Sequence, residues 1–269
     1  MAKERILFIN QEITPYIAAG PVSSLGKFLP VSMQDKGFEV RTFMPKFGAV
    51  NERRNQLHEV IRLSGINIKI NDNDQPLVIK VASLQPSRIQ VYFIDNDDFF
   101  QKLESDLDIS GINRPDNDER AIFFSRGTME TAKKLRWDPK IIHCSGWITS
   151  LIPLYIRKIY SDDISFKDSR IVYAIQPAKQ LAPIDSKIFN KLKDEGIASK
   201  DLKKYSSENP DINLLHKMGI DFANAVIIND PDISPELLQY IAESGKPVLE
   251  ARDMELDADK YLDFYNSIP

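Results

Sequence analysis

Apolar and polar residues alternate along this chain in blocks that are typical of strands followed by helices. Residues 6–9 form a continuous apolar run, as expected for a parallel strand that is buried on both faces. Apolar residues then recur at helical spacing from Leu25 to Met33, and Gly37 ends that pattern. A second strand follows and closes at Pro45, so the first 45 residues predict one β-α-β unit.

Residues 57–95 have a different character. Three short runs rich in β-branched and aromatic residues are separated by Asn, Asp, Pro and Ser. This pattern predicts antiparallel hairpins inserted into the α/β plan. Asn96 or Asp97 is then placed to cap a short helix.

The remainder of the chain returns to the strand–helix alternation. We expect strands at 140–147 (with its turn), 170–177, 225–230 and 246–250, and helices at 116–136, 148–160, 212–223, 234–245 and 257–269. Residues 178–210 are lysine-rich and poorly patterned, and we expect them to form a mobile excursion. The fold class is therefore α/β: one Rossmann-like domain over residues 1–269, with a mostly parallel sheet and a small β-hairpin insertion at 57–95.

Composition narrows the class of protein. The 269 residues are 42% hydrophobic and carry a net charge of −4 with acids and bases interspersed, which argues against a nucleic-acid-binding protein. No apolar run is long enough to span a membrane, and residues 1–10 predict a first strand rather than a signal peptide. The single cysteine, Cys144, excludes an intrachain disulfide, and three scattered histidines predict no zinc cluster. We expect a cytoplasmic protein without a metal or another cofactor.

Four stretches of the sequence, in order, carry a resemblance to a known family. They are EITPYIAAGPVSSLGKFLP (12–30), PDNDERAIFFSRG (115–127), DPKIIHCSGWITSLIPLYIRKIY (138–160) and INLLHKMGIDFANAVIIND (212–230). The first resembles the E-V-A-P-F-A-K-T-G-G-L-G-D-V-V-G-A-L-P pattern of bacterial glycogen and starch synthases. The third resembles their D-x-V-H-A-H-D-W-H-T-A-L-x-P-x-Y-L-K pattern. Residues that match in these two stretches are Glu12, Pro15, Gly20, Leu29, Pro30, Asp138, His143, Trp147, Thr149, Leu151, Pro153 and Tyr155.

The resemblance implies the first half of a GT-B glycosyltransferase. Members of that family transfer glucose from a nucleotide-glucose, usually ADP-glucose, to an α-1,4-glucan in a cleft between two Rossmann-like domains. Residues 230–269 resemble no part of the second, nucleotide-binding domain. We therefore expect that domain to be absent.

The departures from the family pattern are at residues that take part in the family's chemistry. In the first stretch, Ala18 stands at the family's phosphate-binding lysine, Pro21 at its second glycine and Ser24 at its aspartate. In the third stretch, Ser145 and Gly146 replace a histidine and an aspartate. Pro21 also has no N–H to offer a phosphate. Because the lysine, one glycine and the second domain are missing together, we assign no catalytic residue.

Four residues remain as candidates for substrate binding. Glu12 follows the first strand, where it could accept hydrogen bonds from sugar hydroxyls or from the loop backbone. Gly20 is expected to supply a positive φ at the loop apex. His143 is either a sugar contact or a partly buried histidine bonded to a loop carbonyl, and Trp147 is either a stacking platform for a sugar or a core residue. A lysine run is expected to form a solvated face, with a glucan or protein docking surface as the alternative: Lys187, Lys191, Lys193, Lys200, Lys203 and Lys204.

These features predict a glycogen/starch-synthase-like protein of α-glucan metabolism that is not catalytic as an isolated chain. It would act as a glucan-binding or partner-binding module. Two alternatives stay open: half of a split glucosyltransferase completed by another chain, or a small-ligand-binding α/β protein. The expected ligands are an α-glucan or a nucleotide sugar, with no nucleic acid and no membrane.

Overall fold

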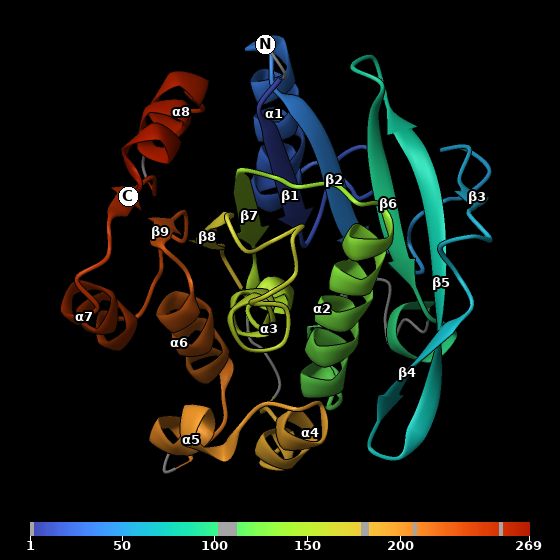
Figure 1. The fold of residues 1–269 in the computed structure, drawn as a ribbon. Helices are drawn as coiled ribbons and strands as arrows, with labels where there is room; N and C mark the ends of the chain where they lie inside the picture. Colours follow the sequence, from blue (N-terminus) through green and yellow to red (C-terminus); the bar gives the residue numbers. More distant parts are fainter. Residues whose placement is uncertain (1–2, 102–111, 179–182, 207–208, 253–254) are drawn as a thin grey trace.

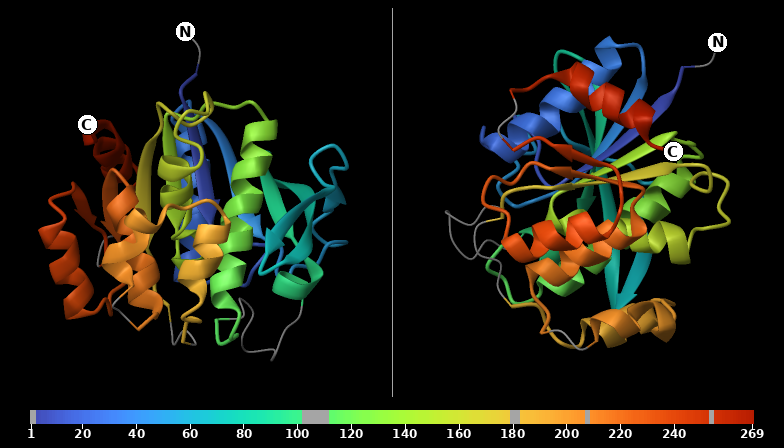
Figure 2. Two further views of the ribbon diagram at one scale, coloured as in Figure 1. Left: turned by 60° about the horizontal axis from the view of Figure 1, so that its bottom comes forward. Right: turned by 90° about the vertical axis from the view of Figure 1, so that its left-hand side faces the viewer.

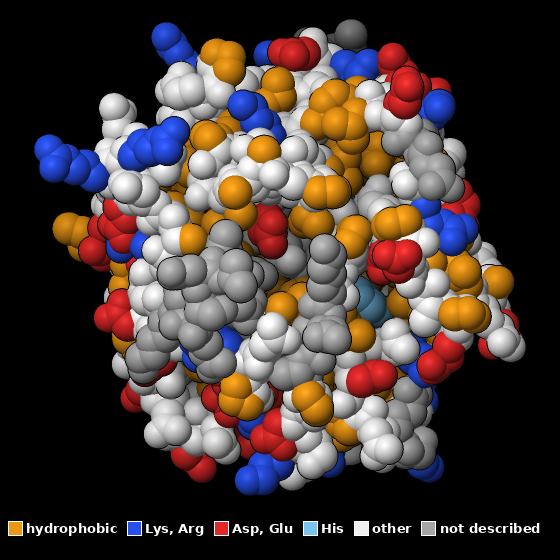
Figure 3. All heavy atoms as spheres, turned by 180° about the vertical axis from the view of Figure 1, so that it is seen from behind, with side chains coloured by type: hydrophobic (Ala, Val, Ile, Leu, Met, Phe, Trp, Pro, Cys, Tyr) orange, Lys and Arg blue, Asp and Glu red, His pale blue; other side chains and the backbone are white. Residues whose placement is uncertain are grey.

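A computed structural model describes residues 3–101, 112–178, 183–206, 209–252 and 255–269. A twisted sheet forms the middle layer of the molecule (Figure 1). Helices α1 (Pro21–Asp35) and α8 (Ala258–Ser267) cover one face of this sheet (Figure 2). Helices α2 (Asn117–Lys134), α3 (Ile152–Lys158) and α6 (Ile212–Phe222) cover the other. On the face that carries α1 and α8, acidic and basic side chains are interspersed between apolar patches (Figure 3).

The sheet has the strand order β10-β9-β8-β7-β1-β2-β6-β5-β3, with β4 paired to β5. Its strands are β1 (Arg5–Asn10), β2 (Glu39–Pro45), β3 (His58–Glu59), β4 (Ile66–Ile70), β5 (Asn73–Leu84), β6 (Ile89–Asp95), β7 (Ile141–Ser145), β8 (Arg170–Ile175), β9 (Ala225–Ile228) and β10 (Val248–Glu250). Every pair from β10 to β6 is parallel, which confirms the mostly parallel α/β fold. In the central strands, Phe8 lies beside Thr42 on one side and His143 on the other.

The helices lie close to the ranges predicted from periodicity. They are α1 (Pro21–Asp35), α2 (Asn117–Lys134), α3 (Ile152–Lys158), α4 (Ile188–Asp194), α5 (Ser199–Leu202), α6 (Ile212–Phe222), α7 (Pro235–Glu243) and α8 (Ala258–Ser267), with short π or 3₁₀ turns η1 (Asp97–Gln101), η2 (Trp147–Thr149) and η3 (Lys203–Tyr205). Asn96 caps η1, because its Oδ1 accepts hydrogen bonds from the backbone N–H groups of Asp98 and Phe99, both at 3.0 Å.

The hairpin segment is continuous with the main sheet. Strands β4 and β5, and β5 and β6, pair antiparallel as the sequence predicts. Strand β6 also pairs parallel with β2, from Thr42 opposite Val91 to Pro45 opposite Ile94. Its apolar residues are buried on both faces. The hairpin segment therefore extends the main sheet and does not form a separate lobe.

The lysine-rich region is more ordered than its sequence suggests. We predicted a mobile excursion over 178–210, but its described residues form α4, α5 and η3. Leu192, Leu202 and Tyr205 are buried against the domain, each at most 1% exposed. That prediction was wrong for these residues because short helices need only one or two buried anchors; residues 179–182 and 207–208 lie outside the described ranges.

Candidate functional site

The carboxyl ends of the central parallel strands meet at one edge of the sheet, which is where doubly wound folds bind ligands. Four of these ends carry a neutral polar side chain: Asn10 closes β1, Ser145 closes β7, Gln176 follows β8 and Asn229 follows β9. Gln176 Nε2 donates to Ser145 Oγ at 2.8 Å. We call this row of side chains, together with Gln11, the amide edge.

Several buried polar atoms of the amide edge have no hydrogen-bond partner within the described residues. They are Asn10 Nδ2, Gln11 Oε1 and Asn229 Nδ2. Asn10 is 3% exposed and Gln11 is 4% exposed. Buried donors and acceptors are usually satisfied, so these atoms are positions for ordered water, and a ligand hydroxyl would reach them only where the amide edge opens.

Gly146 allows the loops after β1 and β7 to close against each other. Its φ is +93°, and a Cβ at this position would lie 2.5 Å from Gln11 Oε1. The backbone N–H of Gln11 donates to the Ser145 carbonyl at 3.0 Å. Gly146, which stands where the family pattern has an aspartate, is therefore required for packing in this chain.

Glu12 lies directly after the amide edge and is partly buried. Desolvation raises the pKa of its carboxyl above the usual value, and a 3.3 Å hydrogen bond from Gln11 Nε2 opposes that rise. Its backbone carbonyl oxygen lies only 2.2 Å from where a Cβ of Gly26 would stand, so α1 approaches this loop as closely as a glycine allows. The structure places Glu12 at the predicted edge, and its binding role stays a prediction.

The loop between β1 and α1 is closed by a serine. Ser23 Oγ accepts a hydrogen bond from the Gly20 N–H at 3.0 Å and donates to the Ala18 carbonyl at 2.8 Å. Gly20 is the N-cap of α1 with φ −155° and ψ 175°, an extended conformation. The expectation of a positive φ at Gly20 was therefore wrong, because Gly20 caps α1 with an extended backbone.

His143 is fully buried in the middle of β7 rather than at its end. Its Nδ1 shares a 2.9 Å hydrogen bond with Tyr265 Oη of α8, and its ring lies 5.3 Å from that of Phe8. Burial lowers the pKa of the imidazole to about 3. Its partner is a tyrosine of the terminal helix instead of the expected loop carbonyl, and contact with a sugar would require α8 to move away.

Trp147 begins the turn after β7 and is 1% exposed. The guanidinium carbon of Arg120 lies 5.9 Å from the centre of its ring. Neither face of the indole is open to solvent, so the core interpretation describes its position. A stacking role for Trp147 stays a prediction that would need this packing to open.

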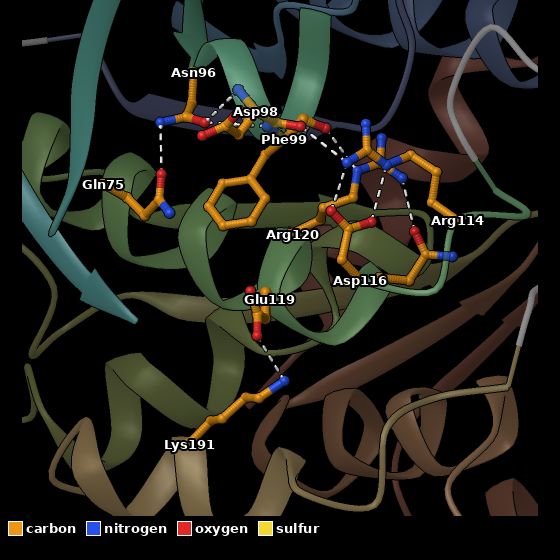
Figure 4. Close-up of polar contacts among 10 residues, drawn as sticks. Gln75, Asn96, Asp98, Phe99, Arg114, Asp116, Glu119, Arg120 and Lys191 are labelled. Carbon is orange, nitrogen blue, oxygen red and sulfur yellow. Dashed lines mark hydrogen bonds and ion pairs between the residues drawn. The ribbon is translucent and has the colours of Figure 1, made fainter. Parts of the chain in front are cut away.

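The second family-like stretch forms a polar cluster at the start of α2 (Figure 4). Arg120, buried to 1% exposure, donates from Nε to the Phe99 carbonyl at 2.8 Å and from Nη1 to Asn117 Oδ1 at 2.7 Å. Arg114 pairs with Asp116, with 2.5 Å between Nη2 and Oδ2. These contacts fix the segment after β6 against α2, a positioning role that the sequence resemblance alone did not reveal.

One lysine of the predicted solvated face is buried. Lys191 of α4 is 6% exposed, and its Nζ lies 2.6 Å from Asp118 Oδ2 and 2.8 Å from Glu119 Oε1 (Figure 4). Asp118 itself is completely buried. The expectation of a solvated face was wrong for Lys191, because two carboxylates at the first turn of α2 hold it inside; Lys193, Lys200, Lys203 and Lys204 are exposed.

Within the described ranges, no group of three or more His, Cys, Asp and Glu side chains is placed to hold a metal ion. Among the same residues, no helix has the length and apolar character needed to cross a membrane. Cys144 is buried, and desolvation raises the pKa of its thiol far above the usual value, which makes it a poor nucleophile.

Comparison with known proteins gives consistent matches over most of the chain. Residues 5–250 match the family model described as starch synthase catalytic domain. A glycogen synthase of Chlorobaculum parvum is 35% identical over 238 residues, which are 87% of this chain and 47% of that protein. A glycogen synthase of Chlorobium chlorochromatii is 32% identical over 251 residues, 91% of this chain and 50% of that protein.

A solved structure shares the fold. It is the catalytic domain of starch synthase IV from Arabidopsis thaliana bound to ADP and acarbose, with a TM-score of 0.72 and 17% identity. The match covers 93% of this chain and 52% of that one. The chain thus spans about half the length of the curated relatives it matches.

Proposed function

This chain belongs to the starch synthase catalytic domain family, and from that premise we propose that it binds neutral α-glucan chains at its amide edge and does not transfer glucose by itself. It is a glycogen/starch-synthase-like protein of α-glucan metabolism in this proposal. The 269-residue chain would act as a glucan-binding or partner-binding module.

The β1–α1 loop is the observation that carries this proposal. Residues 11–26 contain no lysine or arginine, and Ala18 stands where the family pattern has a lysine. Pro21 has no N–H, and the Gly20 N–H is already bonded to Ser23 Oγ at 3.0 Å. Binding a diphosphate needs cations and free N–H donors, and this loop offers few of either.

The amide edge, in contrast, suits an uncharged polyhydroxyl ligand. Amide side chains both donate and accept hydrogen bonds, as sugar hydroxyls do. Asn10, Gln11 and Asn229 each have a buried polar atom without a partner among the described residues, and we propose that sugar hydroxyls bond these atoms when the edge opens. The raised pKa of Glu12 further indicates an environment that disfavours added negative charge.

The test is a titration of the purified chain with maltoheptaose and with ADP-glucose, followed by a transfer assay with labelled ADP-glucose. We expect saturable binding of maltoheptaose, no saturable binding of ADP-glucose at millimolar concentration, and no label in glycogen. Asn229→Ala should weaken glucan binding, whereas the matched change Asn213→Ala on α6 should not. Steady incorporation of labelled glucose by the wild-type chain would overturn the proposal.

The half-length match favours a second candidate, in which another chain supplies the remainder of a glucosyltransferase. Adding that chain would then restore transfer of labelled glucose, and the same assay would detect it. If the amide edge binds glucan but no combination of chains transfers glucose, the binding-module proposal stands.

A further inference from the structure

A small pocket lies between α4, α5 and η3, away from the amide edge. Its volume is about 260 Å³, and its lining includes Lys193, Lys200 and Lys203, the hydroxyl side chains of Ser199 and Ser206, and Phe189. The helices α4 and α5 stand next to each other at the bottom of Figure 1, below α2 and α6. We call this feature the lysine pocket.

The three ammonium groups of the lysine pocket are not paired with any carboxylate of the described residues. No acidic residue lines the pocket, and Lys193, Lys200 and Lys203 have no ion pair or side-chain hydrogen bond within the described part of the chain. Two nearby acids are already engaged: Asp201 pairs with Lys158 at 2.8 Å, and Glu195 lies 3.3 Å from Arg126. Three like charges around one small cavity repel each other unless an anion enters it.

The backbone that carries these lysines is firmly attached to the domain. Lys191, on the same helix as Lys193, is held by Asp118 and Glu119 of α2. Leu202, between Lys200 and Lys203, is 1% exposed, and Leu192 is fully buried. The charged side chains therefore extend from fixed positions, which limits the ordering cost of binding an anion between them.

We propose that the lysine pocket is a binding site for a phosphate group, either free pyrophosphate or the phosphate of a phosphorylated sugar. Ammonium groups bind phosphate oxygens as point charges, and the Ser199 hydroxyl adds a neutral donor, whereas Ser206 Oγ already donates to the Lys203 carbonyl at 2.8 Å. A volume of about 260 Å³ accommodates a diphosphate or a sugar phosphate and is below the usual range for larger organic ligands. The lysine pocket differs from the proposed glucan-binding site, the amide edge, in both its residues and its ligand.

The experiment is calorimetric titration of the full chain with pyrophosphate, with a hexose phosphate and with the unphosphorylated hexose, in a low-salt buffer. Backbone NMR shifts recorded in parallel locate the site. We expect saturable binding of at least one phosphate compound, none of the free hexose, and shifts confined to residues 189–206. The tighter of the two phosphate compounds identifies the source of the ligand.

Two triple variants with the same change of charge separate a site from a general charge effect. Lys193→Ala, Lys200→Ala and Lys203→Ala together should weaken binding at least tenfold. Changing Lys69, Lys167 and Lys260 to alanine, all exposed and outside the pocket, should change it less than twofold. Equal loss in both variants, no saturable binding at 10 mM ligand, shifts outside 189–206, or binding only of an acidic peptide such as oligoglutamate would each overturn the proposal.

Discussion

The hydroxyl of Tyr265 and Nδ1 of His143 share a 2.9 Å hydrogen bond that joins the terminal helix α8 to the central strand β7. Both side chains are buried, with Tyr265 at 2% exposure and His143 at 0%. His143 Nε2 has no partner among the described residues. The bond to Tyr265 is thus the one described contact that satisfies a nitrogen of this buried imidazole.

Tyr265→Phe should destabilise the protein by about 1–3 kcal/mol, because it leaves both nitrogens of a buried imidazole without a partner. Urea denaturation at pH 7 measures the change. Tyr261→Phe is the matched control on the same helix, since its hydroxyl bonds Asn229, which is partly exposed and can turn to water. Its cost should be about 1 kcal/mol or less; equal costs for the two variants would contradict the argument.

Two buried histidines should make the fold sensitive to mild acid. Burial lowers the pKa of His143 to about 3 and that of His216, which shares a 2.7 Å hydrogen bond with Tyr173, to about 4. Both values lie below the unfolded value of about 6.5, so the unfolded chain binds more protons between pH 6.5 and 4. Stability therefore falls as the pH decreases through this window, by about 2 kcal/mol per histidine at pH 5.

The comparison that isolates this effect is the wild type against His143→Gln with His216→Gln. The free energy of unfolding, measured by urea at pH 7 and pH 5, should drop less in the double variant. Acids with raised pKa values, such as Glu12 and Asp118, act in the opposite direction, but they are present in both proteins. An equal drop in both proteins would show that the histidines titrate normally in the fold.

The alternation of strands and helices was predictable because each element buries a continuous face, which leaves a period in the sequence. The parallel pairing of β6 with β2 was not, since it joins segments across the intervening hairpins and leaves no local signal. Helix α4 did leave a local signal in the sequence, because Ile188, Lys191 and Leu192 have the spacing of one helix face. Reading Lys191 as part of that face would have predicted its burial.

Gly146→Ala should cost more than backbone strain alone. The φ of +93° is unfavourable for alanine, and the new Cβ would lie 2.5 Å from Gln11 Oε1. Gly37→Ala is the control, because its φ of +97° is nearly the same and nothing lies within 4 Å of the added Cβ. We expect the free energy of unfolding to decrease by about 1 kcal/mol for Gly37→Ala and by at least about 2 kcal/mol for Gly146→Ala, measured by thermal or urea unfolding.

Lys191→Met should destabilise the protein by about 3–5 kcal/mol, because it leaves the completely buried Asp118 without its cation. The double change Lys191→Met with Asp118→Asn should recover much of that loss, since the buried charge is then also removed. Lys193→Met, two residues away and exposed, should have little effect. Urea denaturation, together with protease cleavage within residues 183–206, distinguishes loss of the α4 anchor from a general surface effect.

The edge at which Glu12 lies was predictable from the sequence, whereas the surroundings of the candidate residues were only partly predictable. The position of Glu12 follows from the end of an apolar strand. The burial of His143 and Trp147 depends on α8 and on Arg120, which are distant in the sequence. Gly26 gave a usable signal, since a glycine inside a helical pattern indicates a close approach of backbone, here to the Glu12 carbonyl.

Restoring the family's lysine should not restore nucleotide-sugar binding. A charge-assisted contact to phosphate is worth about 1.5–3 kcal/mol, so Ala18→Lys could add at most that to an interaction too weak to measure. Pro21 still lacks an N–H, and Ser23 Oγ still engages the Gly20 N–H at 3.0 Å. We expect Ala18→Lys, alone or with Pro21→Gly, to show neither saturable ADP-glucose binding at millimolar concentration nor transfer of labelled glucose to glycogen. Ala18→Met is the control for side-chain length without charge. Transfer by Ala18→Lys but not by Ala18→Met would show that one missing cation had silenced an otherwise complete site, and the binding-module proposal would fall.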